Sequence, residues 1–251
     1  MAVEKDKSND KTESSNSSIC KKAAGIKAFV FDMDGLLFDS ERIVQRSWEI
    51  AGDELGIPHM GDIIYHTLGM NRAGRNEYFR KHIREDFPFE EFGELTRDNF
   101  WKIVDKEGLP LKRGAKELLA YGKAQGYKMA VATSSSREYA MGNLIRAGID
   151  SYFDNVICGD MVKKAKPDPE IYQKTCESLG ISPADCMAFE DAPGGILSAH
   201  QAGMQVIMVP DLVQPTEEIR NLTYRVCDSL ADVIGDGKSG FFPVPGGFQA
   251  R

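Results

Sequence analysis

The stretch IKAFVFDMDG, residues 26–35, decides the fold of this chain. Its first six residues form a short apolar run rich in strand-forming side chains, with Gly25 before it and Asp32 after it, which predicts a buried β-strand. Similar runs recur at residues 127–132, 155–158, 186–189 and 205–209, with helical patterns between them at 114–125, 137–147, 170–179 and 195–201. Strands alternating with helices indicate right-handed crossovers and a mostly parallel sheet covered on both faces.

The long interval between the first two predicted strands breaks this alternation. It carries helical patterns at residues 41–55, 73–84 and 89–106, and GLP at 108–110 returns the chain to the sheet. We therefore expect an all-α domain of residues 41–109 inserted into a core made of residues 25–40 and 110–235. Insertions at the carboxyl end of a strand often act as lids, because α/β folds bind ligands at that edge. A helical connection without a function is the alternative.

The two ends of the chain have a different composition. Residues 1–24 are rich in charge, serine and asparagine and have no apolar block, which predicts a disordered leader and neither a signal peptide nor a membrane span. Residues 236–251 hold too much glycine and proline for regular structure, so we expect an irregular tail, loose or with its aromatic side chains on the surface.

Charge and cysteine content exclude several classes of protein. The net charge of −7 and the pI near 5.3 argue against a broad electrostatic grip on nucleic acid. The five cysteines are odd in number, widely spaced and without a CxxC pair, which predicts free thiols in a reducing cytoplasm. They are Cys20, Cys158, Cys176, Cys186 and Cys227.

Two acids follow the first predicted strand. Asp32 and Asp34 leave the strand at the carboxyl edge of the sheet, where Asp32 can act as a nucleophile and metal ligand and Asp34 as a general acid and base. By itself such a pair is more often a solvated turn. A second acidic pair, Glu190 and Asp191, follows the 186–189 run and would supply the hard oxygen ligands that Mg²⁺ prefers. The alternative is a pair of acids that cap the next helix.

Two further clusters suit a phosphate group. Thr133 and Ser134 lie where the second strand meets a helix, and hydroxyls with free N–H groups at such a junction hold anions. The alternative is a helix cap. Lys166, fixed before Pro167, would offset the repulsion between an aspartate nucleophile and a phosphate, and we favour it over Lys163 and Lys164, although most lysine runs are simply solvated.

These clusters, in this order, resemble the four motifs of the haloacid dehalogenase superfamily of phosphatases and phosphomutases. The resemblance covers about residues 27–209: the motif DxDGxLxDS stands at residues 32–40, and the other three motifs are Thr133-Ser134, Lys166-Pro167 and Glu190-Asp191. It implies an α/β fold, with a Rossmann-like, mostly parallel sheet core and an inserted helical cap. The position of the insertion is similar to that in the β-phosphoglucomutase and phosphoglycolate phosphatase subgroup, in which the cap selects the substrate.

The resemblance also implies roles for the site residues. Asp32 would become phosphorylated, Asp34 would protonate the leaving group and then activate water, and Thr133, Ser134 and Lys166 would hold the phosphate. Mg²⁺ would bind Asp32, the Asp34 carbonyl, Asp191 and, directly or through water, Glu190. In the cap, the loop at residues 68–72 resembles a substrate-contacting loop, which makes Arg72 the candidate there; a solvent-exposed arginine is the alternative.

Three functions stay open at this stage. The first is a magnesium-dependent phosphatase of a small phosphorylated metabolite, such as a sugar phosphate or a nucleotide-like monophosphate. The second is a sugar phosphomutase, which the lack of histidine at residues 41–45 disfavours because related mutases carry one there. The third is a binding protein without activity, which the intact motifs disfavour. For the first we expect a cytoplasmic monomer that uses neither nucleic acid nor a membrane.

Overall fold

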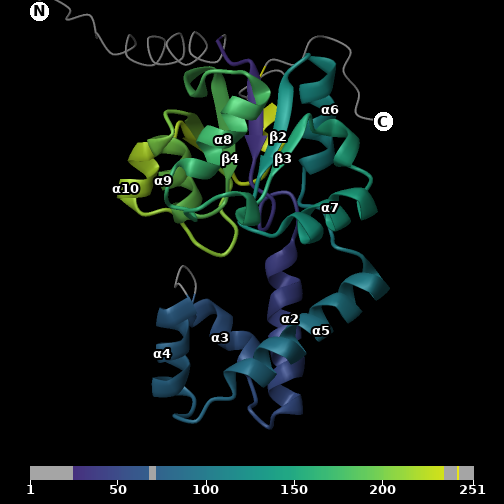
Figure 1. The fold of residues 1–251 in the computed structure, drawn as a ribbon, viewed down its shortest axis with the longest axis vertical. Helices are drawn as coiled ribbons and strands as arrows, with labels where there is room; N and C mark the ends of the chain where they lie inside the picture. The colour runs from purple at the N-terminus through teal and green to yellow at the C-terminus, as the bar shows by residue number, and fades with distance from the viewer. Residues whose placement is uncertain (1–24, 68–71, 235–241, 243–251) are drawn as a thin grey trace, which may run out of the picture.

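The computed structural model describes residues 25–67, 72–234 and 242. Its centre is a parallel six-stranded sheet in the order β3-β2-β1-β4-β5-β6 (Figure 1). Phe31 of the first strand lies opposite Val131 on one side and Phe189 on the other, so β1 is central. The strands are β1 Ala28–Phe31, β2 Lys128–Ala132, β3 Asn155–Ile157, β4 Cys186–Glu190, β5 Gln205–Met208 and β6 Arg225–Val226. The predicted α/β class is confirmed; only β6, two residues long, gave no recognisable apolar run.

Helices cover both faces of this sheet, because apolar side chains of β1 point alternately to one face and to the other. Phe29 and Phe31 pack in one cluster with α6 Ala115–Ala124, α7 Arg137–Arg146 and α11 Ala231–Ile234. Ala28 and Val30 face the other cluster, with α8 Glu170–Leu179, α9 Pro193–Gln201 and α10 Glu217–Leu222. Short 3₁₀ turns at Asp150–Tyr152, Gly159–Met161 and Pro183–Asp185 complete the connections. A strand buried on both faces explains why residues 26–31 are almost continuously apolar.

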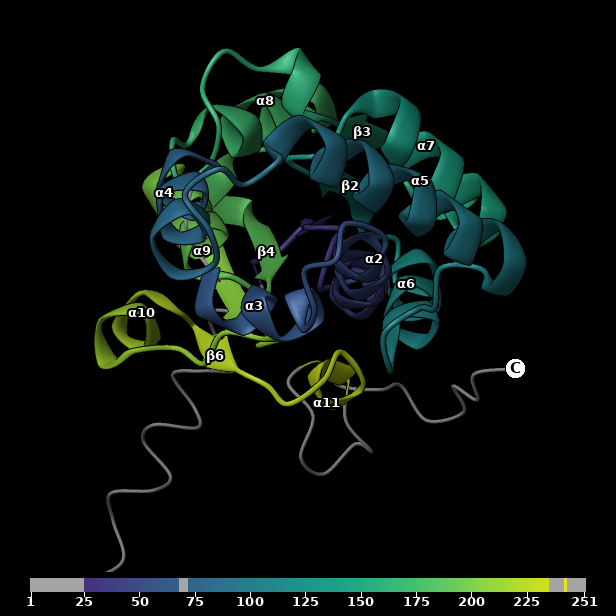
Figure 2. The same ribbon diagram turned by 90° about the horizontal axis from the view of Figure 1, so that it is seen from below.

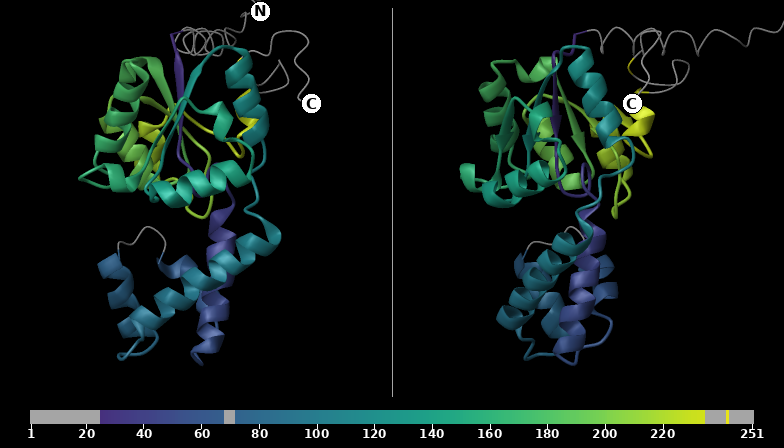
Figure 3. Two further views of the ribbon diagram at one scale, coloured as in Figure 1. Left: turned by 45° about the vertical axis from the view of Figure 1, so that its right-hand side comes forward. Right: turned by 90° about the vertical axis from the view of Figure 1, so that its right-hand side faces the viewer.

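Four helices between β1 and β2 form a separate body below the carboxyl ends of the strands (Figures 1 and 3). They are α2 Ser40–Glu54, α3 Met60–Thr67, α4 Arg72–His82 and α5 Phe89–Glu107, and we call residues 40–107 the helical module. Seen from below, α3 and α5 lie beside α2, and α4 lies farther away (Figure 2). The module has its own aromatic core, in which the Trp48 ring lies 5.7 Å from Phe79 and 5.6 Å from Phe92. The short helix α3 was not predicted from the sequence.

The ends of the chain are described only at Phe242. The predicted leader at residues 1–24 and the rest of the predicted tail at 236–251 lie outside the described residues. Phe242 is 1% exposed, its ring centre lies 5.0 Å from that of Phe29, and its N–H donates to the carbonyl of Val233. This aromatic side chain of the tail is therefore part of the core and not of the surface.

Two other sequence predictions concern the chain as a whole. The cysteines within the described ranges are free and buried, namely Cys158, Cys176, Cys186 and Cys227, while Cys20 lies outside those ranges. Within the same ranges, no helix combines the length and the apolar character that crossing a bilayer requires.

Candidate active site

The carboxyl ends of β1, β2 and β4 lie side by side, and the polar clusters that follow them meet in one pocket of about 660 Å³. The pocket is lined by all the predicted site residues except Arg72: Asp32, Asp34, Thr133, Ser134, Lys166, Glu190 and Asp191. Arg72 is the first residue of α4, but its side chain is outside the described part of the structure. Parallel strands that share an edge thus bring together residues that are far apart in the sequence.

Lys166 lies at the centre of this pocket. Its ammonium group donates to Asp32 Oδ1 at 2.5 Å, to Glu190 Oε1 at 2.7 Å and to the carbonyl of Ala132 at 2.9 Å. The side chain is only 10% exposed. Burial lowers the pKa of Lys166, but the Asp32 and Glu190 carboxylates outweigh this effect and hold the pKa above its usual value. The lysine is therefore a permanent cation next to the candidate nucleophile.

The neighbouring lysines take no part in this pocket. Lys164 forms an ion pair with Asp168, and the backbone N–H groups of Lys163 and Lys164 donate to the Glu170 carboxylate. Both side chains are exposed. Of these three lysines, Lys166 alone lines the pocket.

Three carboxylates crowd one side of the pocket. Oxygen atoms of Asp32, Glu190 and Asp191 lie within 4.8 Å of one another. Burial, followed by the charges of Asp32 and Glu190, raises the pKa of Asp191 well above its usual value, and burial raises that of Glu190 to about 6. Lys166 alone cannot neutralise three acids, whereas Lys166 together with a hard divalent cation can, so this set of donors fits Mg²⁺.

The alternative role of the second acidic pair, capping a helix, is not seen. The N-cap of α9 is Ala192, and no side chain caps this helix. Gly195 explains part of the local geometry, because a Cβ at this position would collide with the Glu190 carboxylate. The glycine therefore leaves room for the acid under the first turn of α9.

Asp34 is held by two hydroxyl groups. Ser135 Oγ donates to Asp34 Oδ2 at 2.7 Å, and Tyr139 Oη donates to Asp34 Oδ1 at 3.1 Å. Burial raises the pKa of Asp34, and the hydrogen bonds from Ser135 and Tyr139 oppose this rise. A carboxyl group with a raised pKa retains a proton at higher pH than a free aspartate does, which suits a group that both gives and takes protons.

The hydroxyl-bearing residues after β2, residues 133–136, make different contacts. Thr133 is 1% exposed and its Oγ1 accepts from the N–H of Ser135, whereas Ser134 is exposed at the pocket. The capping role falls to Ser136, whose side chain accepts from the N–H of Tyr139. The helix cap is therefore Ser136, and Thr133 and Ser134 remain candidates for phosphate binding.

Several residues of the site were missed by sequence reasoning. Tyr172 of α8 donates to Glu190 Oε1 at 2.5 Å, and Glu41 of α2 lines the pocket, where burial first and the charge of Asp34 second raise its pKa to about 7. Ser135 and Tyr139, which hold Asp34, were missed as well. A tyrosine inside a helix gives no sequence signal for such a contact, although Ser135 stood within the hydroxyl cluster.

The chain is similar to known proteins. Residues 26–203 match the model of the family described as haloacid dehalogenase-like hydrolase, which is more than half of the chain. The chain belongs to the haloacid dehalogenase-like hydrolases. The family match covers all the motif residues of the pocket, and together with the relatives below it identifies this haloacid dehalogenase-like hydrolase as a phosphatase.

Two curated relatives and one solved structure illustrate the similarity. The phosphorylated carbohydrates phosphatase of Thermotoga maritima is 31% identical, over 72% of this chain and 84% of that protein. Hexitol phosphatase A of Escherichia coli is also 31% identical, over 73% of this chain and 82% of that protein. The structure of CbbY from Rhodobacter sphaeroides with phosphate superposes with a TM-score of 0.69 at 26% identity, over 83% of this chain and 96% of that one.

Proposed function

We propose that this phosphatase hydrolyses a small phosphorylated metabolite, a sugar phosphate or a nucleotide-like monophosphate, with Mg²⁺ and through a phosphorylated Asp32. The observation that carries the proposal is the contact of Lys166 Nζ with Asp32 Oδ1 at 2.5 Å inside a pocket that also holds Asp34, Glu190 and Asp191. A fixed cation beside a carboxylate reduces the repulsion that a phosphate dianion would otherwise meet.

In the first step, an oxygen of Asp32 attacks phosphorus and the bond to the ester oxygen breaks. Asp34 gives its proton to this oxygen, so the alcohol leaves neutral and Asp34 becomes a carboxylate. Thr133, Ser134 and Lys166 hold the remaining phosphate oxygens. In the second step, Asp34 takes a proton from water while the water oxygen bonds to phosphorus and the bond from phosphorus to the Asp32 oxygen breaks. Phosphate is released, Asp32 is again a carboxylate and Asp34 is again protonated.

Asp32, Asp191 and Glu190 would hold Mg²⁺, with the carbonyl of Asp34 as a further donor. The ion supplies positive charge to the phosphoryl oxygens while charge builds up on them.

We further propose that the helical module acts as a cap on the core. Its position below the carboxyl ends of the strands supports this role (Figure 1). The proposed division is a core of residues 25–40 and 110–235 and a cap of residues 41–109, with Arg72 as the contact to the substrate. We expect a monomer in the cytoplasm that binds neither nucleic acid nor membranes, and the free buried cysteines support a reducing compartment.

The test is phosphate release by the purified protein from a panel of sugar phosphates and nucleoside monophosphates, with Mg²⁺ or with a chelator. We expect release that depends on Mg²⁺. A mutase would instead convert one sugar phosphate into its isomer, with little free phosphate, when a sugar bisphosphate activator is added. That result, or no turnover of any ester in the panel, would contradict the proposal.

A further inference from the structure

Asp211 lies at the same edge of the sheet as the candidate metal ligands, although it was not predicted from the sequence as a site residue. It is the third residue after β5, which is the neighbour of β4 in the sheet. The N–H of Val209 donates to the carbonyl of Glu190 at 2.8 Å, so the chain that leads to Asp211 leaves the sheet beside Glu190 and Asp191. Neighbouring parallel strands thus bring a further acid to the candidate metal ligands.

The two oxygens of the Asp211 carboxylate have different surroundings. Oδ1 accepts a hydrogen bond of 2.6 Å from the ammonium group of Lys112. Oδ2 is buried and has no hydrogen-bond partner among the described residues, and the whole side chain is only 9% exposed. An unpaired buried carboxylate oxygen is unfavourable, so a donor at Oδ2 would stabilise this arrangement.

Lys112 holds the carboxylate of Asp211 in one orientation. The N–H of Lys112 donates to the carbonyl of Leu37 at 2.9 Å, and Leu37 is fully buried in the core. The base of the ion pair is therefore fixed by the core. With Oδ1 tied to this lysine, Oδ2 has a defined position before any ligand binds.

Oδ2 of Asp211 faces the carboxylate cluster. A Cβ built on Gly35 would collide with Asp191 Oδ2 and would lie 3.5 Å from Asp211 Oδ2, so both oxygens approach the same point. Burial first, and then the charges of nearby acids that include Asp211, raise the pKa of Asp191. Asp211 is not one of the three acids whose oxygens lie within 4.8 Å of one another. It therefore lies next to the candidate metal ligands without being one of them.

The charges of this region fit one divalent cation. Lys166 offsets one of the three clustered acids, and Lys112 offsets Asp211. Two negative charges remain, which one Mg²⁺ ion neutralises. Mg²⁺ bound to a protein usually keeps several waters, and the charge of the ion makes these waters strong hydrogen-bond donors. A water on the ion is therefore a suitable donor for Asp211 Oδ2.

We infer that Asp211 is a positioning residue for Mg²⁺: its Oδ2 accepts a hydrogen bond from a water on the ion, while Lys112 fixes its Oδ1. The inference rests on the proposed function, because that function includes the Mg²⁺ site. Asp211 contacts neither the ion nor the substrate and acts through one of the waters of the ion.

The test is the dissociation constant of Mg²⁺, measured by calorimetric titration of the metal-free protein without substrate. We expect Asp211→Asn to raise this constant by about tenfold, the scale of a lost contact to the surroundings of a bound metal. The amide oxygen is needed at Lys112, which leaves the NH₂ group at the position of Oδ2, where it cannot accept a hydrogen bond. Asp211→Ala removes both oxygens, should weaken binding at least as much, and keeps the test valid if Asp211→Asn does not fold.

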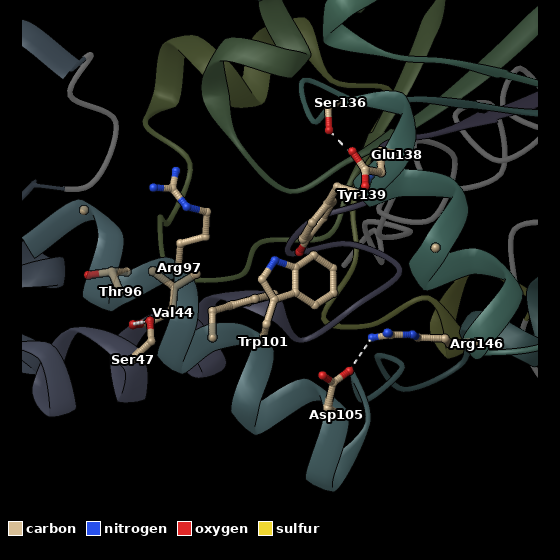
Figure 4. A pocket seen from close by; sticks show the side chains of 13 residues that line it. Val44, Ser47, Thr96, Arg97, Trp101, Asp105, Ser136, Glu138, Tyr139 and Arg146 are labelled. Atoms are coloured by element: carbon tan, nitrogen blue, oxygen red, sulfur yellow. Dashed lines mark hydrogen bonds and ion pairs between the residues drawn. The ribbon is translucent and has the colours of Figure 1, made fainter. Parts of the chain in front are cut away.

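Asp105→Asn is the matched control. Asp105 also forms an ion pair with a base, Arg146, at 2.9 Å. This pair lies at a cavity of about 750 Å³ beside Trp101, between the helical module and the core (Figure 4). Asp105 does not belong to the carboxylate cluster, so this variant should bind Mg²⁺ as tightly as the wild type does.

The outcomes separate this inference from the proposed function. An unchanged dissociation constant in a folded Asp211 variant would overturn the inference and leave the pair with Lys112 as a structural contact only. Equal weakening by Asp105→Asn, or a wild type that binds no Mg²⁺ at millimolar concentrations, would overturn it as well. If Mg²⁺ binds with the expected dependence on Asp211 but no phosphate ester is hydrolysed, the proposed function fails and the role of Asp211 at the metal stands.

Discussion

Tyr139 Oη donates a hydrogen bond of 3.1 Å to Asp34 Oδ1, and the ring of the same tyrosine packs against Phe100 and Trp101 of the helical module. One side chain of α7 therefore contacts both the candidate general acid and the inserted helices. A displacement of α5 relative to the core would therefore shift Tyr139 and alter its hydrogen bond to Asp34. The helical module and the candidate general acid are thus connected through side-chain contacts as well as through the polypeptide chain.

Removal of this hydroxyl should change the pH dependence of the reaction. The Tyr139 hydrogen bond lowers the pKa of Asp34, so Tyr139→Phe should raise that pKa further and move the alkaline limb of kcat to higher pH. Because more Asp34 then keeps its proton, kcat measured on that limb should rise, by about tenfold for each unit by which the pKa rises. Tyr127→Phe is the control, because Tyr127 stacks on Phe29 and does not line the pocket. An unchanged pH profile would show that Tyr139 does not tune Asp34.

The nucleophile can be tested without disturbing the fold. Asp32→Asn should lower phosphate release by at least about a thousandfold, because an amide cannot accept the phosphoryl group. Lys166 keeps its contact with Glu190, so the circular dichroism spectrum should match that of the wild type. Asp62→Asn, at an exposed position of α3, is the matched control and should retain activity. Wild-type turnover by folded Asp32→Asn would refute the mechanism.

Mg²⁺ should stabilise the folded chain even without substrate. An ion at about 100 times its dissociation constant adds about 2.7 kcal/mol, which for a domain of this size raises Tm by about 5 °C or more. Asp191→Asn should show a smaller increase in Tm with Mg²⁺. Without Mg²⁺ this variant should be at least as stable as the wild type, because burial and neighbouring acids already disfavour the charge of Asp191. Thermal scans with Mg²⁺ or a chelator measure both effects.

The control for this experiment is Asp228→Asn, which changes an exposed acid outside the cluster. It should show the full rise in Tm with Mg²⁺. An equal rise for Asp191→Asn would place the ion elsewhere.

The loop that carries Lys166 should respond to acid through Glu170. The backbone N–H of Lys163, with the Lys174 ion pair second, lowers the pKa of Glu170 to about 2. A depressed pKa means stabilisation that is complete above the unfolded-state pKa of about 4.3 and is lost as the pH falls toward 2. Glu170→Gln should therefore unfold at a lower temperature than the wild type at pH 7, and the difference should vanish near pH 2. A difference independent of pH would show that the carboxylate charge is not responsible.

Phe242 should contribute to stability and not to catalysis. Because its ring is buried among Phe29, Tyr121 and Tyr127, Phe242→Ala should cost about 3–5 kcal/mol in the free energy of unfolding. Urea denaturation measures this loss, and kcat/KM of the folded variant should stay near that of the wild type. Ile145→Ala is the control, since Ile145 is 58% exposed and should change stability by less than about 0.5 kcal/mol. Equal stability of both variants would contradict the core role of Phe242.

Local patterns in the sequence were sufficient to predict the sheet and to predict that the motif residues lie close together. A mostly apolar run as short as residues 26–31, rich in strand-forming side chains, favours a buried strand over a helix. Parallel strands deliver the residues that follow them to one edge of the sheet. Asp32, Thr133 and Asp191 line one pocket for this reason. Lys166 could be predicted as well, because an aspartate that attacks a phosphate needs a cation beside it.

Only the tertiary structure decided which side chains support these residues. Tyr139 and Asp34 are 105 positions apart and Tyr172 and Glu190 are 18 apart, and their contacts depend on how α7 and α8 dock on the sheet. The burial of Phe242 and the cavity beside Trp101 arise in the same way, from packing between distant segments. Strand formation is a local response to hydrophobic pattern, whereas such contacts depend on the packing of whole elements, which no short stretch of sequence encodes.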